Sequence, residues 1–198
     1  MVDLHLHTIH SDGTASVREM LALCEKLKLK AISITDHNSI DAYKEIESEN
    51  LHGLFGGKLL VGIELSATVQ GIEIEILGYG IDWQKMDKLI PNDMKGNCHH
   101  VGLTFQKVIG MIRQCDGKAV LAHPGRYKHA VELVIDKIDG IEVYHLSNSQ
   151  EYRQHLLELC REHNLIITGG SDFHGTSEPQ LINCEKLPYE MFEQFANG

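Results

Sequence analysis

The sequence of 198 residues lacks several features that mark specialised classes of protein. It has no apolar run long enough to cross a membrane, and no basic segment followed by an apolar core at its N-terminus. We therefore expect a cytoplasmic protein without membrane partners. Its five cysteines are widely spaced and include no C-x-x-C pair, which argues against a zinc-finger framework. We expect them to be reduced thiols, most of them buried.

Basic residues are also scarce. The chain has 18 Lys and Arg against 28 Asp and Glu, a formal net charge of −10. Proteins that bind long nucleic acids need clustered Lys and Arg for the phosphates, so we expect no long nucleic acid as a partner. A small anionic substrate is still compatible with this charge, because bound metal ions reverse the local field. Histidine, by contrast, is abundant, with 13 residues.

The hydrophobic pattern alternates between short strands and amphipathic helices within one expected domain, residues 1–198. Strands are predicted over residues 2–7, 30–37, 58–65, 71–80, 117–125, 140–145 and 165–175. Helices are predicted over 14–29, 39–49, 127–138 and 149–164, and residues 83–116 are predicted to be mostly helical with a break near PNDMKGN. Ser16 and Glu19 form a capping box, and Gln70-Gly71 is the expected turn of a hairpin. This alternation predicts an α/β fold with a largely parallel sheet, either open or closed into a barrel.

Ionisable side chains gather at the C-terminal ends of the predicted strands, where loops of parallel α/β folds converge on one functional surface. His5 and His7 are two residues apart, so both should point inward while Leu4 and Leu6 pack outward. Asp3 should support them from the same face, and His10 should be a solvent-facing loop residue. The other residues placed at this end are Asp12, Asp36, His37, Glu64, Glu73, Glu75, His123, Glu142, His145, Asp172 and His174.

Each of these residues alone has an ordinary structural explanation, such as a hydrogen-bonded core histidine, a helix cap or a turn. As a set they indicate a metal site, because unpaired buried imidazoles and carboxylates are costly. This mixture of ligands suits Mn²⁺, Zn²⁺ or Fe²⁺ better than Ca²⁺ or Mg²⁺. About nine ligands exceed the needs of one ion, so two or three divalent ions are expected.

The segments HLHTIHSDG, TDHN, GIELS, AHPGR, GIEVY and GSDFHG, in this order, resemble the PHP (polymerase and histidinol phosphatase) family, most closely its stand-alone phosphoesterase branch. The resemblance implies a distorted (β/α)7 TIM-like barrel, a trinuclear metal site and hydrolysis of phosphate esters. It also implies that residues 83–116 form a reduced version of a helical lobe. The ligands that it implies are His5, His7, Asp12, His37, Glu64, His123, Asp172 and His174.

The chain departs from the family pattern at two positions. It reads EILGY where relatives typically read HILGY, so Glu75 takes the place of a histidine and adds a negative charge to the ligand set. Relatives often have a histidine shortly after GIEVY, where this chain reads HLSNS. Either His145 or Asn148 stands in for that histidine, or the contact is lost.

From this site we expect a metal-dependent phosphatase. Its substrate would be a small phosphomonoester: a nucleotide, a nucleoside bisphosphate, or a sugar or amino-alcohol phosphate. Water between two cations has a lowered pKa and supplies hydroxide to attack phosphorus. Arg126 would hold the phosphate, Asp36 would orient a ligand, and His145 is a candidate general acid.

Three alternatives are open. A 3′–5′ exonuclease of short oligonucleotides is disfavoured by the acidic balance of the chain. A metal-dependent amidohydrolase also uses H-x-H on its first strand, but does not account for the SDG, TDH and SDFHG motifs together. A non-catalytic metal-binding module is disfavoured by the intact ligand set, although Glu75 leaves room for it. The sequence does not indicate the oligomeric state.

Overall fold

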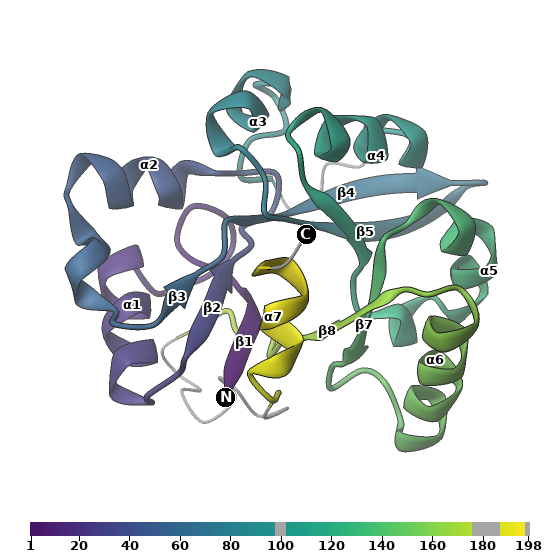
Figure 1. Ribbon diagram of the computed structural model, residues 1–198. Helices are drawn as coiled ribbons and strands as arrows, with labels where there is room; N and C mark the ends of the chain where they lie inside the picture. Colours follow the sequence, from purple (N-terminus) through teal and green to yellow (C-terminus); the bar gives the residue numbers. More distant parts are fainter. Residues whose placement is uncertain (98–101, 176–186, 197–198) are drawn as a thin grey trace.

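A computed structural model describes residues 1–97, 102–175 and 187–196 (Figure 1). Its strands form two sheets with helices packed around them. The first sheet is parallel and contains β1 (Val2–Leu6), β2 (Ala31–Ile34) and β3 (Lys58–Leu59), in that order. The second has the order β4 (Gly62–Val69), β5 (Ile72–Tyr79), β6 (Lys118–Leu121), β7 (Gly140–Tyr144) and β8 (Ile166–Gly169).

The predicted hairpin is formed by β4 and β5. These strands are antiparallel, with Val69 opposite Ile72, and the turn residues Gln70 and Gly71 have φ values of 48° and 81°. Two left-handed residues are what a two-residue type I′ turn requires. β5 is antiparallel to β6 as well, whereas β6, β7 and β8 run parallel to one another. The sheet is therefore parallel except at this hairpin.

Two isolated bridges join the two sheets. A parallel bridge between His37 and Glu64 joins the chain after β2 to β4, and another between Leu6 and Phe173 joins β1 to the chain after β8. The strands thus follow one another in a ring. The α/β class is confirmed. The predicted barrel is seen only in part. In the described residues a single bridge joins the sheets at each of two seams, and no continuous ladder of hydrogen bonds crosses either seam.

The helices are α1 (Val17–Lys26), α2 (Asp41–Ser48), α3 (Trp83–Leu89), α4 (Phe105–Gln114), α5 (Val131–Val134), α6 (Gln150–Glu162) and α7 (Glu190–Ala196). The predicted break near PNDMKGN is confirmed, because the stretch 83–116 is divided into α3 and α4; its residues 98–101 lie outside the described part. The helix predicted over 127–138 is a single α-helical turn, α5, between short 3₁₀ turns. α7 had no clear signal in the sequence.

Three of the cysteines, Cys24, Cys115 and Cys160, are free and buried, as expected. Cys98 and Cys184 lie outside the described residues. Within the described segments, no helix is both long and apolar enough to cross a membrane.

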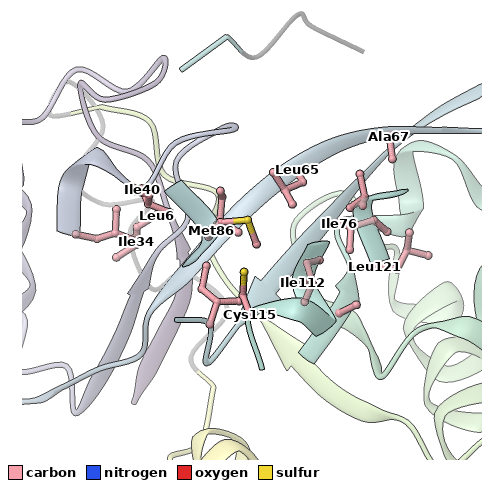
Figure 2. Packing of buried hydrophobic residues seen from close by; sticks show 14 of the residues in the cluster. Leu6, Ile34, Ile40, Leu65, Ala67, Ile76, Met86, Ile112, Cys115 and Leu121 are labelled. Atoms are coloured by element: carbon pink, nitrogen blue, oxygen red, sulfur yellow. The ribbon is translucent and has the colours of Figure 1, made fainter. Parts of the chain in front are cut away.

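The larger hydrophobic core lies between the sheets and the surrounding helices. Figure 2 shows Leu6 and Ile34 packed near Ile40 on one side, and Leu65, Ile76 and Ile112 on the other. A smaller cluster joins Val2 and Leu4 of β1 to side chains of β5, β6 and the C-terminal segment: Leu77, Tyr79, Val120, Ala122, Leu187 and Phe192. Because these strands are not neighbours in the ring, this second cluster fills its interior.

The strand β1 is irregular where the ligands begin. Its register against β2 shifts between Asp3 and Leu6, so that Leu4 belongs to the interior cluster and Leu6 to the outer one. The prediction that Leu4 and Leu6 both pack outward is therefore wrong for Leu4 and correct for Leu6. A bulge changes which face a side chain takes, and bulges are common beside active sites. Asp3 is buried and accepts hydrogen bonds from the backbone N–H groups of His5 and Ser171, in agreement with a supporting role.

The capping box at the start of α1 is present, with Ser16 accepting from the Glu19 backbone N–H and the Glu19 carboxylate accepting from that of Ser16. We predict that Ser16→Ala lowers the free energy of unfolding by about 1 kcal/mol, because an N–H group of the first turn loses its acceptor. Urea denaturation would measure the loss. The control Ser48→Ala, at the exposed end of α2, should change it by less than about 0.5 kcal/mol. Equal effects of the two substitutions would contradict the prediction.

Candidate metal centre

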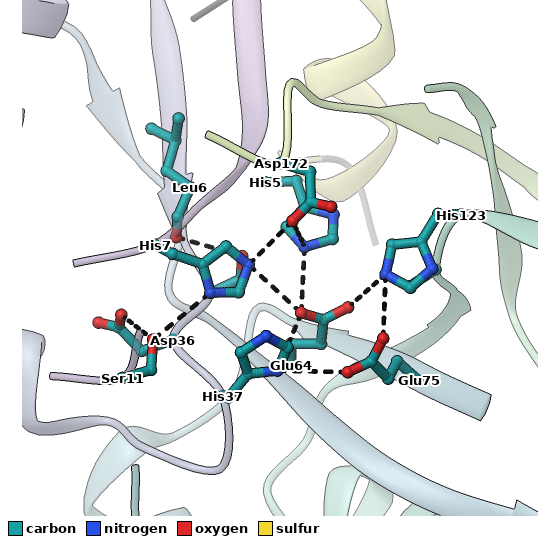
Figure 3. Close-up of polar contacts among 12 residues, drawn as sticks. His5, Leu6, His7, Ser11, Asp36, His37, Glu64, Glu75, His123 and Asp172 are labelled. Atoms are coloured by element: carbon teal, nitrogen blue, oxygen red, sulfur yellow. Dashed lines mark hydrogen bonds and ion pairs between the residues drawn. The ribbon is translucent and has the colours of Figure 1, made fainter. Parts of the chain in front are cut away.

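The centre of the candidate site is the carboxylate of Glu64, which β4 carries into the interior of the ring, where it is fully buried. Figure 3 shows imidazoles from several strand ends converging on it. Its Oε2 atom lies 3.2 Å from His5 Nε2, 3.3 Å from His7 Nε2 and 3.2 Å from His37 Nδ1. Its Oε1 atom lies 2.9 Å from His123 Nε2.

Asp172, just after β8, is a second shared carboxylate. Its Oδ1 atom lies 3.4 Å from His5 Nε2 and 3.3 Å from His7 Nε2, so the imidazoles of β1 face two carboxylates at once. Its Oδ2 atom accepts a 2.6 Å hydrogen bond from Arg126 and lies 3.4 Å from His145 Nε2. Asp172 thus connects the candidate ligands to the two residues predicted to act on the substrate.

Two further carboxylates border the cluster. Asp12, in the loop after β1, lies 3.2 Å from His174 Nε2 and 3.7 Å from His37 Nε2. Glu75, on β5, lies 3.4 Å from His37 Nδ1 and 3.3 Å from His123 Nε2. Glu75 is therefore placed among the candidate ligands although it departs from the family pattern.

These atoms form three groups in which one donor atom of each residue lies within 4.8 Å of the others. The groups are His5, His7, Glu64 and Asp172; His7, Asp12, His37 and His174; and His37, Glu64 and Glu75. They share His7, His37 and Glu64, as expected for ions that lie close together. The structure brings all nine predicted ligands into one cluster, with His123 joined through Glu64 and Glu75. Their role as ligands stays a prediction.

The unpaired nitrogen atoms test whether this cluster suits metal ions. His7 Nε2, His37 Nδ1 and His145 Nε2 are buried and make no hydrogen bond, although carboxylate oxygens lie 3.2–3.4 Å from them. Buried polar atoms without partners are costly, and neutral imidazole is a common ligand of divalent transition metals. Cations between these imidazoles and carboxylates would satisfy both, so the residues fit a metal centre.

The electrostatics of the metal-free cluster are unusual. Burial by itself lowers the pKa of His7, but the Asp172 and Glu64 carboxylates outweigh it and raise that pKa to about 9. Burial lowers the pKa of His37 to about 4, against the attraction of Glu64. Burial, with the negative charge of Glu64, raises the pKa of Glu75 to about 8. Without metal, His7 and Glu75 therefore hold protons at neutral pH.

Asp36 organises the loop after β1. Its carboxylate accepts hydrogen bonds from the backbone N–H and hydroxyl of Thr8, at 2.6 and 2.7 Å, and from the Ser11 hydroxyl at 2.7 Å. Ser11 Oγ in turn lies 3.5 Å from His7 Nδ1, on the side of the ring away from Glu64 (Figure 3). Asp36 is buried beneath this loop, so its contacts suit the orientation of His7 rather than a contact with substrate.

Some expectations for single residues need correction. His10 does not simply face solvent, because it is half-buried and its Nε2 atom lies 2.7 Å from a carboxylate oxygen of Glu45 on α2. Asn148 does not stand in as a ligand, since backbone groups take up both ends of its side-chain amide. Glu73 is exposed and lies apart from the cluster.

Glu142 is not among the predicted ligands or catalytic residues, and the structure places it directly behind His5. Its Oε1 atom lies 2.9 Å from His5 Nδ1. The available signal was an acidic residue inside the apolar strand GIEVY, where a buried carboxylate needs partners.

We predict that the metal-stripped chain binds Mn²⁺ more tightly as the pH rises from 6 to 8. A cation must displace the protons held by His7 and Glu75, and these groups hold fewer protons as the pH approaches their raised pKa values. Isothermal titration calorimetry in two buffers of different ionisation enthalpy would measure affinity and released protons together. An affinity that is independent of pH, with no proton release, would contradict this assignment.

Comparison with known proteins places this site in a family. A family model described as PHP domain matches residues 3–169. The 5′-3′ exoribonuclease Rnm of Escherichia coli strain K12 is 24% identical over 247 aligned positions, which cover 87% of this chain and 84% of that protein. The 3′,5′-nucleoside bisphosphate phosphatase of Chromobacterium violaceum is 31% identical over 103 residues, 47% of this chain and 36% of that protein.

Solved structures agree at the level of the fold. A candidate metal-dependent phosphoesterase from Bifidobacterium adolescentis superposes with a TM-score of 0.71 at 19% identity, covering 94% of this chain and 96% of that one. The family model spans every residue of the cluster except Asp172 and His174, which lie in the segment just after its end and after β8. The chain belongs to the PHP domain family of metal-dependent phosphoesterases.

Proposed function

We propose that this chain hydrolyses a small phosphomonoester with the help of two or three divalent ions, of Mn²⁺, Zn²⁺ or Fe²⁺. The observation that supports this most is that the three donor groups overlap. Each pair of groups has one residue in common, which is His7, His37 or Glu64. Such an arrangement suits ions close enough to act on one phosphate. The mixture of imidazole and carboxylate donors favours these metals over Ca²⁺.

When bound, the cations would lower the pKa of a water molecule to about 7 and offset the negative charge of the phosphate. The chain's own carboxylates make this charge compensation necessary. Asp12, Glu64 and Asp172 lie in one cluster and would repel a phosphate by themselves. Two of the donor groups have four members. The more deeply buried of them consists of His5, His7, Glu64 and Asp172.

In this proposal Arg126 would hold the phosphate. Its side chain is 49% exposed, and its guanidinium donates to Asp172 while lying 3.9 Å from Glu75. A guanidinium presents several N–H groups in one plane, which match two phosphate oxygens. Arg126 would therefore orient a phosphate above the ligands and keep part of its bond to Asp172.

In this proposal His145 would donate a proton to the leaving group. The Ser147 backbone N–H donates to His145 Nδ1 at 3.0 Å, so in the neutral imidazole the proton is on Nε2. That Nε2 atom is buried, lies 3.4 Å from Asp172 Oδ2 and has no hydrogen bond. The backbone contact thus leaves Nε2 as the proton-bearing nitrogen on the side of Asp172, where His145 in its protonated form would donate to the leaving group.

The proposed partner is a single small phosphorylated molecule. We treat the ring of strands as a distorted barrel with its functional mouth at the C-terminal ends of the strands. The net charge of −10 supports neither a long nucleic acid nor a membrane surface as partner. The similarity to the bisphosphate phosphatase from Chromobacterium violaceum supports a nucleotide-like monoester as the substrate.

A second candidate is the removal of nucleotides from short RNA. This candidate is favoured by the sequence similarity to the exoribonuclease of Escherichia coli, whose alignment covers 87% of this chain. That relative is named for 5′-3′ activity, the opposite direction to the 3′–5′ exonuclease considered from the sequence. The same metal ligands can serve the hydrolysis of a monoester or of a diester. The two candidate functions are therefore distinguished by which substrate the chain turns over.

The test is a panel of substrates for the metal-loaded chain: nucleoside monophosphates, nucleoside 3′,5′-bisphosphates, sugar phosphates and 5′-phosphorylated oligoribonucleotides of about five residues. We predict phosphate release from at least one monoester, and its loss in the double variant His5→Ala/Asp172→Ala. Equal activity of that variant would indicate a contaminant. Stepwise shortening of the oligoribonucleotide without release of phosphate from monoesters would favour the second candidate instead. No turnover of any substrate by a fully loaded chain would contradict both.

We also predict that the effect of His145→Gln depends on the leaving group. A lost general acid typically costs 10²–10⁴-fold in rate when the leaving oxygen needs a proton, as for an alkyl phosphate. With p-nitrophenyl phosphate, whose leaving group is stable as an anion, the loss in kcat should be below about tenfold. Steady-state rates for both substrates would decide this. A loss of equal size for both would contradict the role of His145 as proton donor.

A further inference from the structure

The proposed function makes no use of Glu142, a carboxylate on β7 that lies directly behind the candidate ligands. Its side chain is fully buried, and each of its two oxygens has a partner. Oε1 lies 2.9 Å from His5 Nδ1, and Oε2 accepts a hydrogen bond from the His123 backbone N–H at 2.7 Å. These partners come from β1 and from the end of β6, so a single carboxylate connects two separate strand ends of the cluster.

The contact with His5 determines which ring nitrogen holds the proton. A carboxylate can only accept, so His5 Nδ1 must carry the hydrogen of this bond. The other nitrogen, Nε2, then has a free lone pair in the neutral ring, and it lies 3.2 Å from Glu64 and 3.4 Å from Asp172. Carboxylates that bind the outer nitrogen of a ligating histidine are a common means of orienting it towards a metal.

The contact with His123 acts on the backbone. His123 has a φ of 24°, which is unusual for a residue with a side chain, and Pro124 follows it directly. The same turn is held again from β7, since the Asn148 side chain donates to the Glu142 carbonyl and accepts from the Gly125 N–H. In this conformation, His123 Nε2 lies 2.9 Å from Glu64 and 3.3 Å from Glu75.

We infer that Glu142 is a positioning residue that fixes the tautomer of His5 and the backbone of His123, so that both present Nε2 to the same ions. Glutamine has the same shape but cannot do both, because its amide has a single acceptor oxygen. Its NH₂ group would face one of the two N–H donors. The inference rests on the metal ions of the proposed function, and it concerns their binding rather than turnover.

The experiment compares Glu142→Gln with Glu158→Gln, an identical change on the exposed face of α6. Each protein is stripped of metal, checked for folding by circular dichroism and dialysed against a series of Mn²⁺ concentrations before metal analysis. We expect Glu142→Gln to bind Mn²⁺ 10–100-fold more weakly than the wild type, the usual cost of losing such a partner. Glu158→Gln should match the wild type. An affinity of folded Glu142→Gln within twofold of the wild type would overturn the inference.

A second measurement needs no folded variant of Glu142. Long-range ¹H–¹⁵N spectra of the Zn²⁺-loaded wild type report which nitrogen of each histidine ring carries hydrogen, and His5→Gln assigns the signal of His5. We expect hydrogen on Nδ1 of His5 and metal on Nε2. Metal on Nδ1 would overturn the role of Glu142, while leaving phosphoesterase activity intact. A wild-type chain that binds no metal would overturn the metal centre and this inference together.

Discussion

The cluster depends on one interaction, the approach of four imidazoles to the buried carboxylate of Glu64. Both oxygens of this side chain are used, at distances of 2.9–3.3 Å, and the imidazoles come from β1 and from the chain after β2 and β6. A buried charge of this kind is stable only when surrounding groups compensate it. The ring of strands supplies that compensation from several directions, which ties the geometry of the site to closure of the fold at its seams.

The strand ends achieve this convergence through departures from regular backbone. Asn38, His123 and Asp172 all have positive φ, and each follows one of the strands that form the ring. Each has its N–H group held, by the Glu64 carbonyl, the Glu142 carboxylate and the His5 carbonyl, respectively. Unfavourable φ values persist where surrounding contacts hold them, and they concentrate at functional sites. The register shift in β1 is a further departure at the same end of the ring.

The hydrophobic periodicity and the residues typical of turns and helix caps were sufficient to predict most helices and strands, the β4–β5 hairpin and the capping box. Each of these features depends on residues close in sequence. The positions of candidate ligands at strand ends were predictable for the same reason, and the structure brings all nine together. What local patterns do not contain is contact between distant strands. The opposite packing of Leu4 and Leu6 follows from a shift against β2, and the pairing of His10 with Glu45 follows from how α2 packs. The two contacts of Glu142 likewise join segments far apart in the chain.

The interior apolar cluster beneath the candidate ligands has a consequence for how metal ions and substrate enter and leave the site. Val2, Leu4, Leu77, Tyr79 and Val120 fill the ring below the polar groups, and Leu187 and Phe192 of the C-terminal segment pack against them. A hydrated ion crossing this apolar plug would lose its water shell without replacement. Among the described residues this apolar cluster blocks that route, so ions and substrate would enter from the side of Arg126, whose side chain is half exposed. A molecule bound there would slow the release of ions beneath it, so that occupancy by substrate and retention of metal would be kinetically coupled.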